Sequence, residues 1–377
     1  MVDSVGTEAS YRCIRCRGCK DCTKSAQIEC ISIQEELEQG LIGKSVTVHP
    51  DGCYSEAYLP FLCDPTKKLV TNYHRALNFY NKQSKMLLSK PIDLEDICNA
   101  MKKLFTLGFV SKLSDLSEQQ KSIINANPVK YYIPWMAVWN SNSLSAQCRP
   151  VFNASSPTAS GYSLNDLLPK GRNNLNKLVQ IFIRWLTYSC GFCTDVQKMY
   201  NTIKLAEKHW CYQLFLWDDD LSNEPSVCVI TTLIYGVKSS GNQAEQALRE
   251  TTKLFQEKYP LQNNMIQNDT YVDDCASGLN VFEDGKLNAT ASYEEAKTVT
   301  DDLQIVLNRG GFKLKGITFS GSKPSEHLSD GEEFVTVAGI KWFPESDLLS
   351  LNIKELNFSK KLHGKKSQKG VGQVPKN

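Results

Sequence analysis

The stretch TYVDDCASG (residues 270–278) places two adjacent carboxylates, Asp273 and Asp274, inside a short strand–turn–strand pattern. β-Branched and aromatic residues precede them, and this composition favours a hairpin. Upstream, CGFCTDV (residues 190–196) is a mostly apolar run that carries Asp195 near its end, and it predicts a buried strand. We expect the two strands to be neighbours, which would bring the three carboxylates together.

The order of the elements around these strands indicates an α+β fold. Periodicity and turn residues predict a helix at residues 175–186, the Asp195 strand at 190–196, a hairpin at 215–233 and a helix at 242–257. The acidic hairpin at 270–278 follows, then a capped helix that opens at Ser292 and strands at 312–314 and 334–340. An order of strand, helix, hairpin, helix and strand is typical of the ferredoxin-like split βαβ unit.

Three carboxylates in one place form a concentrated negative site, which is costly unless cations neutralise it. Two divalent metal ions about 4 Å apart, held by such carboxylates, are a common device for in-line nucleotidyl transfer. We therefore expect Asp195, Asp273 and Asp274 to bind two Mg²⁺ ions. A further acidic run, WDDD (residues 217–220), is followed by turn-forming residues, and we interpret it as a solvated turn.

Six blocks of the sequence resemble, in the same order, the reverse transcriptase region of the pol polyprotein of BEL/Pao-type LTR retrotransposons: CRPVFNASS…GYSLNDLLPKG, FCTDVQKMY, TLIYGVKSSGNQAEQALR, TYVDDCASG, LNRGGFKLKG and VTVAGIKWF. The resemblance covers most of the chain. It implies a right-hand polymerase fold with a ferredoxin-like palm and fingers, truncated before a full thumb and RNase H. It implies RNA-directed DNA synthesis from a primer on an RNA or DNA template, with deoxynucleoside triphosphates.

The resemblance also implies roles for individual residues. The catalytic, metal-binding carboxylates correspond to Asp195, Asp273 and Asp274. Substrate-binding positions correspond to Arg149 at the triphosphate, Tyr200 as the ring that excludes a ribose 2′-hydroxyl, and Tyr235 with Gly236 beside the new base pair. Primer or template positions correspond to Ser239, Ser240, Gly339, Lys341 and Trp342. Protonation of the leaving pyrophosphate falls to Lys313 or Lys315. Without the resemblance, Tyr200 also fits a packed aromatic residue, and residues 337–342 also fit a buried strand.

We divide the chain into four parts. A Cys-rich basic segment covers residues 1–30 and an N-terminal helical extension covers residues 31–126. The fingers and palm cover residues 127–345, and a basic tail, expected to be partly disordered, covers residues 346–377. The protease, RNase H and integrase that accompany such a polymerase are expected to be missing partners. Asn153 stands where the family generally has an acidic residue. The alternative function is therefore a catalytically inactive, nucleic-acid-binding remnant of a retroelement.

The Cys-rich segment contains a C-x2-C-x2-C-x2-C run made by Cys13, Cys16, Cys19 and Cys22. Four thiolates so close together suggest a Zn²⁺ site, although typical zinc sites separate their two ligand pairs more widely. The run lacks the x3-C-P ending of a bacterial iron–sulfur motif. A zinc site, an iron–sulfur site and unmetallated thiols therefore all stay open.

Overall charge excludes a histone-like polycation, because 43 Lys and Arg stand against 41 Asp and Glu, for a net charge of +2. Nucleic-acid binding must then depend on local basic clusters, such as the lysines of residues 360–369. We expect no signal peptide and no membrane span. Most of the fourteen cysteines are scattered among apolar residues, and this favours an intracellular location, in a cytoplasmic particle or the nucleus.

Overall fold

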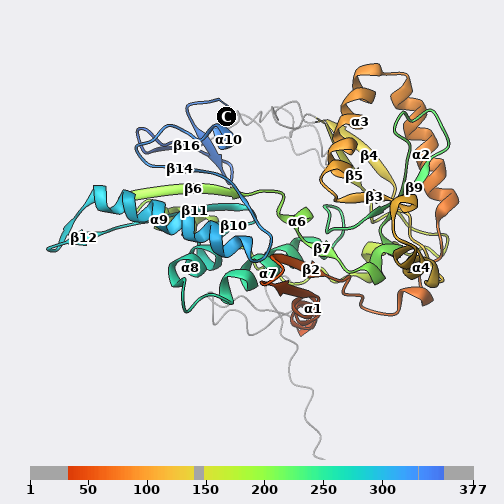
Figure 1. The fold of residues 1–377 in the computed structure, drawn as a ribbon, viewed down its shortest axis with the longest axis horizontal. Helices are drawn as coiled ribbons and strands as arrows, with labels where there is room; N and C mark the ends of the chain where they lie inside the picture. The colour runs from red at the N-terminus through yellow and green to blue at the C-terminus, as the bar shows by residue number, and fades with distance from the viewer. Residues whose placement is uncertain (1–32, 140–147, 330, 352–377) are drawn as a thin grey trace, which may run out of the picture.

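The computed structural model describes residues 33–139, 148–329 and 331–351, and in this part of the chain helices combine with several small sheets (Figure 1). The predicted thiol cluster at Cys13, Cys16, Cys19 and Cys22 and the lysines of residues 360–369 lie outside the described residues. Figure 1 shows two groups of elements, one around a central sheet and one around two long helices, joined through a smaller sheet.

Four antiparallel strands form the central sheet. In spatial order they are β10 (Thr270–Tyr271), β11 (Asp274–Leu279), β6 (Cys190–Val196) and β14 (Leu314–Phe319). β6 lies inside the sheet because it is apolar on both faces. Phe192 packs on one face with Cys275, whereas Cys193 packs on the other with Ala276.

Helices cover one face of this sheet, and a helix and a small sheet cover the other. The first face packs against α8 (Pro260–Asn268) and α9 (Ala289–Asn308), with α7 (Ser240–Lys253) beside them (Figure 1). The second face packs against α5 (Leu178–Trp185) and the sheet of β15 (Val335–Val337), β16 (Ile340–Phe343) and β17 (Leu348–Leu351). There the rings of Trp185 and Trp342 lie 4.8 Å apart, centroid to centroid.

The second group of elements contains the helices α2 (Tyr73–Leu88), α3 (Pro91–Thr106) and α4 (Glu118–Ala126). Two sheets accompany them: β3 (Val110–Lys112), β9 (Ser226–Ile230) and β8 (Leu214–Trp217) in one, and the hairpin β4 (Trp135–Trp139) and β5 (Cys148–Phe152) in the other. Helix α3 packs against β5. Its Pro91 occupies the first helical turn, where the missing N–H costs nothing.

The two groups are joined by α1 (Ile33–Lys44) and the sheet of β1 (Val46–His49), β2 (Tyr54–Ala57) and β7 (Lys204–Leu205). Shorter elements complete the described chain: α6 (Met199–Thr202), β12 (Phe282–Glu283), β13 (Lys286–Leu287), α10 (Glu326–Ser329) and 3-10 turns at Pro65–Lys67, Leu113–Asp115, Leu164–Leu167 and Glu207–Tyr212. Residues 31–126 are thus not only helical. Through β2 and β3 they pair with β7 and β9 of the later chain.

Several predicted elements are confirmed and others are displaced. The strand over residues 190–196 forms as predicted, and the hairpin predicted over residues 215–233 forms from β8 and β9. The helix expected to open at Ser292 begins at Ala289 instead, because the side chain of Asn288 caps it by accepting a hydrogen bond from the Ala291 N–H (3.0 Å). The single strand expected at 334–340 is split into β15 and β16 by a tight turn.

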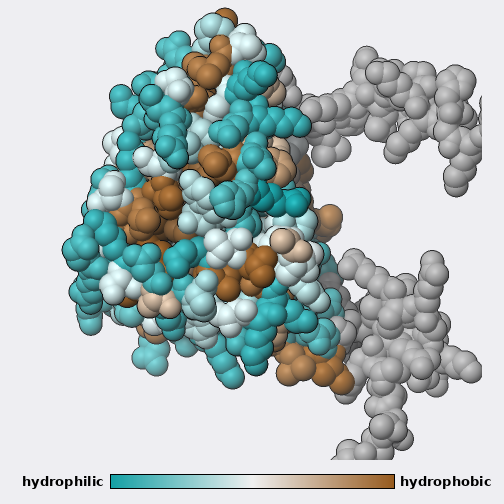
Figure 2. Space-filling model, turned by 90° about the vertical axis from the view of Figure 1, so that its right-hand side faces the viewer, coloured by the Kyte–Doolittle hydropathy of each residue, from teal (hydrophilic) through white to brown (hydrophobic). Residues whose placement is uncertain are grey.

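No helix within the described ranges is long and apolar enough to cross a membrane. Figure 2 views the end of the molecule that lies to the right in Figure 1. Its surface is mostly hydrophilic, with separate hydrophobic areas between the polar side chains. Scattered apolar side chains of this kind are normal on a protein surface and by themselves indicate no partner.

Candidate active site

The register of the central sheet brings the three predicted carboxylates together. Asp274, the first residue of β11, is paired directly with Asp195 of β6. Directly opposed residues of an antiparallel pair have Cβ atoms roughly 5 Å apart. Asp273 lies in the two-residue turn before β11, and its carbonyl accepts a hydrogen bond from the Val196 N–H (2.8 Å). All three acidic residues therefore lie at one end of the sheet.

These carboxylates repel one another in a half-buried environment. Burial, followed by the charges of Asp273 and Asp274, raises the pKa of Asp195 to about 7. Burial also raises the pKa of Asp274 to about 6, although its Oδ2 accepts a hydrogen bond from the Ala338 N–H (2.9 Å). Burial raises the pKa of Asp273 as well. Among the described residues none of the three forms an ion pair, so their charge is not balanced locally.

The donor set suits a hard divalent cation, since it consists of carboxylate oxygens whose raised pKa values reflect a need for positive charge. In the described part of the chain, however, no three His, Cys, Asp or Glu side chains are arranged so that they alone could hold a metal ion. Mg²⁺ usually binds through one or two carboxylates together with substrate phosphates rather than in an all-protein cage. A metal ion here would accordingly need ligands from the substrate.

Three residues with strained backbone conformations lie next to the three carboxylates or contact them. Val272, Lys198 and Ala338 all have left-handed backbone conformations, with φ values of 59°, 50° and 46°. This region is unfavourable for residues other than glycine, and most of all for a β-branched residue such as Val272. Val272 precedes Asp273, Lys198 follows β6, and Ala338 donates to Asp274. Strain of this kind is often found at functional sites, where the surrounding structure maintains it.

The turn between β15 and β16 reaches the carboxylates through Ala338. The next residue, Gly339, is exposed and has φ 89°, so the turn bends tightly at this point. The ammonium group of Lys341 lies over the ring of Phe334, 3.9 Å from its centroid. Trp342 is buried, and its indole N–H donates to Asp347 (2.9 Å). Three residues of this hairpin, Gly339, Lys341 and Trp342, are predicted to contact the primer. The Trp342 side chain is instead buried in the hydrophobic core.

A cavity of about 650 Å³ opens beside the carboxylates. Its walls include Asp195 and Asp273, and also Arg149 of β5 and Lys315 of β14. A β-bulge in β14 lies next to Lys315, between Leu314 and Ile317. The charge of Lys315 lowers the pKa values of Asp195 and Asp274 against the effect of burial. Lys313 is exposed and does not line the cavity, so the geometry favours Lys315 between the two predicted proton donors.

Two tyrosine rings pack against each other beside the cavity, tilted by 34°. The rings of Tyr200 and Tyr235 lie 4.1 Å apart, centroid to centroid. Tyr235 is 58% exposed and lines the cavity, whereas Tyr200 is half-buried and is not among the residues of the cavity wall. Gly236 follows with φ 99°, and a Cβ atom at this position would lie 2.2 Å from the Phe152 carbonyl oxygen. Only glycine therefore allows this close approach of the loop to β5.

Ser239 and Ser240 do not present their side chains to a template. Both residues are fully buried, and the Ser239 hydroxyl donates to the side chain of Gln243 (3.0 Å). Ser239 is the N-cap of α7 and Ser240 is its first residue, and this helix packs against the hydrophobic core. Their burial argues against the prediction that these serines contact nucleic acid.

The structure adds two cations that the sequence did not single out for this site. Lys103 of α3 and Lys198, in the turn after β6, both line the cavity. Lys198 lies three residues after Asp195 within the block FCTDVQKMY, so its position could have drawn attention to it. Lys103 is one of many surface-type lysines in the sequence, and only the packing of α3 against β5 reveals its location.

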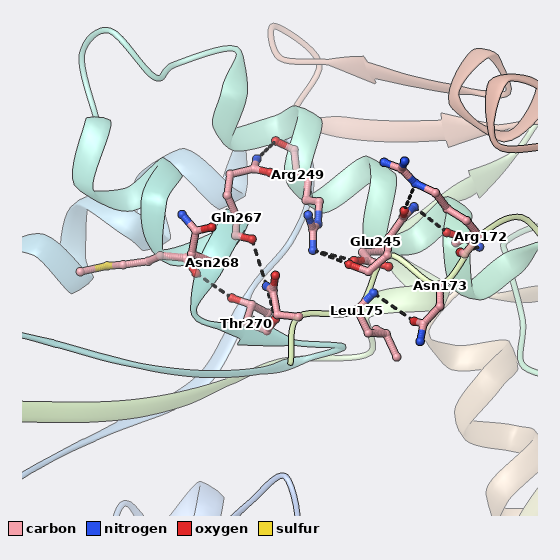
Figure 3. A network of polar contacts seen from close by, with 12 residues as sticks. Arg172, Asn173, Leu175, Glu245, Arg249, Gln267, Asn268 and Thr270 are labelled. Carbon is pink, nitrogen blue, oxygen red and sulfur yellow. Dashed lines mark hydrogen bonds and ion pairs between the residues drawn. The ribbon is translucent and has the colours of Figure 1, made fainter. Parts of the chain in front are cut away.

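Two other buried carboxylates nearby have arginine partners. Glu245 of α7 pairs with Arg249 (2.7 Å), as Figure 3 shows, and Asp269 pairs with Arg184 of α5 (2.7 Å). Figure 3 also shows the polar contacts that attach the segment before α5 to α7 and α8. Arg249 contributes to them by donating to the carbonyl of Asn174 (3.0 Å).

No protein-family model matches this chain, and no curated protein matches it at a significant level. The functional interpretation consequently depends on the sequence blocks and on the geometry of the site.

Proposed function

We propose that this chain comprises the fingers and palm of a reverse transcriptase, which extends a primer on an RNA template with deoxynucleoside triphosphates. The observation that carries the proposal is the pairing of Asp274 with Asp195, with Asp273 in the adjoining turn, at the edge of a cavity that also contains cations. The spatial strand order β10-β11-β6-β14, with helices on one face, also agrees with a ferredoxin-like palm and supports the proposed fold.

In this proposal Asp195, Asp273 and Asp274 are the carboxylates that would bind the catalytic metal ions. Two Mg²⁺ ions bound there with a triphosphate would promote attack by the primer 3′-hydroxyl and neutralise the charge on the leaving pyrophosphate. Arg149 presents a planar set of N–H donors to phosphate oxygens. Lys315, close to the carboxylates, holds the proton that the pyrophosphate takes up.

The remaining residues position the substrates. The packed rings of Tyr200 and Tyr235 form an aromatic surface for the sugar and base of the incoming nucleotide, and Tyr200 excludes a ribose 2′-hydroxyl. Gly236 allows this surface to lie against β5. The turn at Ala338 and Gly339 supports the primer end, because its hydrogen bond to Asp274 fixes it beside the carboxylates.

Primer extension with the purified chain tests the proposal. The substitution Asp273→Asn removes one charge with little change of shape. It should reduce extension on an RNA template about a thousandfold or more, because metal-bound charge stabilisation contributes several kcal/mol to such reactions. Asp220→Asn, in the exposed turn after β8, is the matched control and should extend normally. A wild-type chain that binds primer–template without extending it would favour the inactive remnant instead.

A further inference from the structure

The cavity is built by elements from opposite ends of the described chain. Its wall includes Asp195 and Asp273 of the central-sheet region, and α3 supplies Asp96 and Lys103. Lys198 joins them from the turn that follows β6. Residues 91–106 are therefore part of the cavity wall, rather than of a separate N-terminal extension.

Lys103 and Lys198 place two positive charges near each other. The pKa of Lys198 is lowered by burial and by the charge of Lys103. Its ammonium group lies 5.4 Å from the centroid of the Phe109 ring. Within the described ranges neither lysine forms an ion pair, and the nearby Asp96 accepts a hydrogen bond from the Trp139 indole (3.3 Å). Asp96, Asp195 and Asp273 line the same cavity, but none of them pairs with either lysine in the described part of the chain. The two like charges therefore favour the binding of an anion.

We infer that Lys103 and Lys198 bind the terminal phosphates of the incoming nucleoside triphosphate. The inference rests on the proposed function and extends it, because it assigns part of the triphosphate site to helix α3. The composition of the cavity wall supports metal binding by the carboxylates and phosphate binding by the cations. The carboxylates occupy one wall of the cavity, Arg149 reaches it from β5, and the two lysines supply further positive charge on elements packed around the same space.

A polyphosphate fits this arrangement better than a single phosphate. A cavity of about 650 Å³ has the size of a typical small-molecule site. Phosphate oxygens accept charge-assisted hydrogen bonds from Lys and Arg, and several such donors around one cavity can contact successive phosphates. The carboxylates of the cavity would repel the same anion unless a divalent cation accompanied it, so the combination of carboxylates and cations favours a metal–triphosphate.

Binding of inorganic tripolyphosphate to the full chain tests the inference without requiring catalysis. Isothermal titration at low salt, with Mg²⁺ present, should show that Lys103→Gln and Lys198→Gln each weaken binding about tenfold, because each removes one charge-assisted hydrogen bond to a phosphate oxygen. Lys102→Gln changes the exposed neighbour on α3, which does not line the cavity, and should bind within about twofold of wild type. Lys198→Arg should restore most of the affinity.

Failure of the phosphate-binding inference can be distinguished from failure of the polymerase proposal. If both Gln variants bind tripolyphosphate as wild type does, the inference is wrong, whether or not the chain extends primers. If the wild type extends no primer but its tripolyphosphate affinity depends on both lysines, the phosphate site stands and the polymerase proposal fails. Should Lys198→Gln not fold, Lys198→Asn carries the same test, because asparagine tolerates the left-handed backbone at this position.

Discussion

Two groups of buried carboxylates lie close together in this protein and differ in how their charge is balanced. Asp269 and Glu245 each have an arginine partner at 2.7 Å. Asp195, Asp273 and Asp274 have no arginine or lysine ion-pair partner among the described residues, although Ala338 donates a hydrogen bond to Asp274 and the charge of Lys315 acts on Asp195 and Asp274. Burial raises the pKa of all three unpaired residues. The first group is satisfied by ion pairs within the chain, whereas the second forms no ion pair in the described part of the chain.

This difference separates structural from functional acids. A buried ion pair holds its elements in place, and loss of one partner leaves an uncompensated charge. A group of unpaired carboxylates reduces stability in the free protein, and it can be retained at a site where a ligand supplies the missing positive charge. The same conservative substitution should therefore have opposite effects on stability in the two groups.

The largest effect is expected at the paired acid. Asp269→Asn leaves Arg184 without its partner and weakens the hydrogen bond from Ser277 Oγ (2.7 Å), so the free energy of unfolding should fall by about 3 kcal/mol. Urea denaturation followed by circular dichroism measures this change. Neutralising the exposed Glu294, which pairs loosely with Lys297 (3.9 Å), is the control and should change stability by less than about 1 kcal/mol. An equally small effect of Asp269→Asn would remove the distinction between the groups.

The opposite sign is expected at the unpaired acid. Asp195→Asn removes mutual repulsion, so at pH 8 without divalent metal ions it should raise the free energy of unfolding by about 1 kcal/mol or more, since one pKa unit corresponds to about 1.4 kcal/mol. The same urea experiment applies. Destabilisation of the metal-free chain by Asp195→Asn would mean that this carboxylate contributes to the fold.

The pH dependence follows from the same residues. In the folded chain the pKa values of Asp195 and Asp274 are raised to about 7 and about 6, from 3.8. Between these values the folded state binds more protons than the unfolded state, so these two residues make stability fall as the pH rises from about 4 to about 7. Melting temperatures in a pH series should show this fall for the wild type and a shallower one for Asp195→Asn. Equal slopes for the two chains would contradict the pKa shift.

Much of this arrangement could be predicted from the sequence, because it depends on local patterns. The apolar run with Asp195 and the Y-x-D-D hairpin specified two strands and their turn, and their pairing followed from the expected order of elements. Other features depend on tertiary packing. The approach of Lys103 to the cavity requires α3 to dock on β5, and the burial of Ser240 and Trp342 depends on their packing partners. The break at Ala338 went unpredicted because alanine rarely adopts a left-handed conformation.

The smallest effect is expected from relief of backbone strain at the unpaired group. Ala338→Gly should raise the free energy of unfolding by about 0.5–1 kcal/mol, because glycine adopts a left-handed conformation without steric cost. Ala126→Gly, at the end of helix α4, makes the same change at a right-handed position and should lower stability by up to about 1 kcal/mol. Thermal unfolding of both variants provides the comparison. Two changes of the same sign would show that Ala338 is not strained.

Single-nucleotide incorporation on an RNA template tests most directly whether the unpaired carboxylates form a metal-dependent nucleotidyl-transfer site. The full chain, with a labelled DNA primer, one deoxynucleoside triphosphate and increasing Mg²⁺, should extend the primer by one nucleotide. The rate should rise with Mg²⁺ and fall about a thousandfold or more in Asp273→Asn, while primer–template binding measured by fluorescence anisotropy stays nearly unchanged. Incorporation by Asp273→Asn at the wild-type rate, or none by a wild-type chain that binds both substrates, would contradict the proposed site.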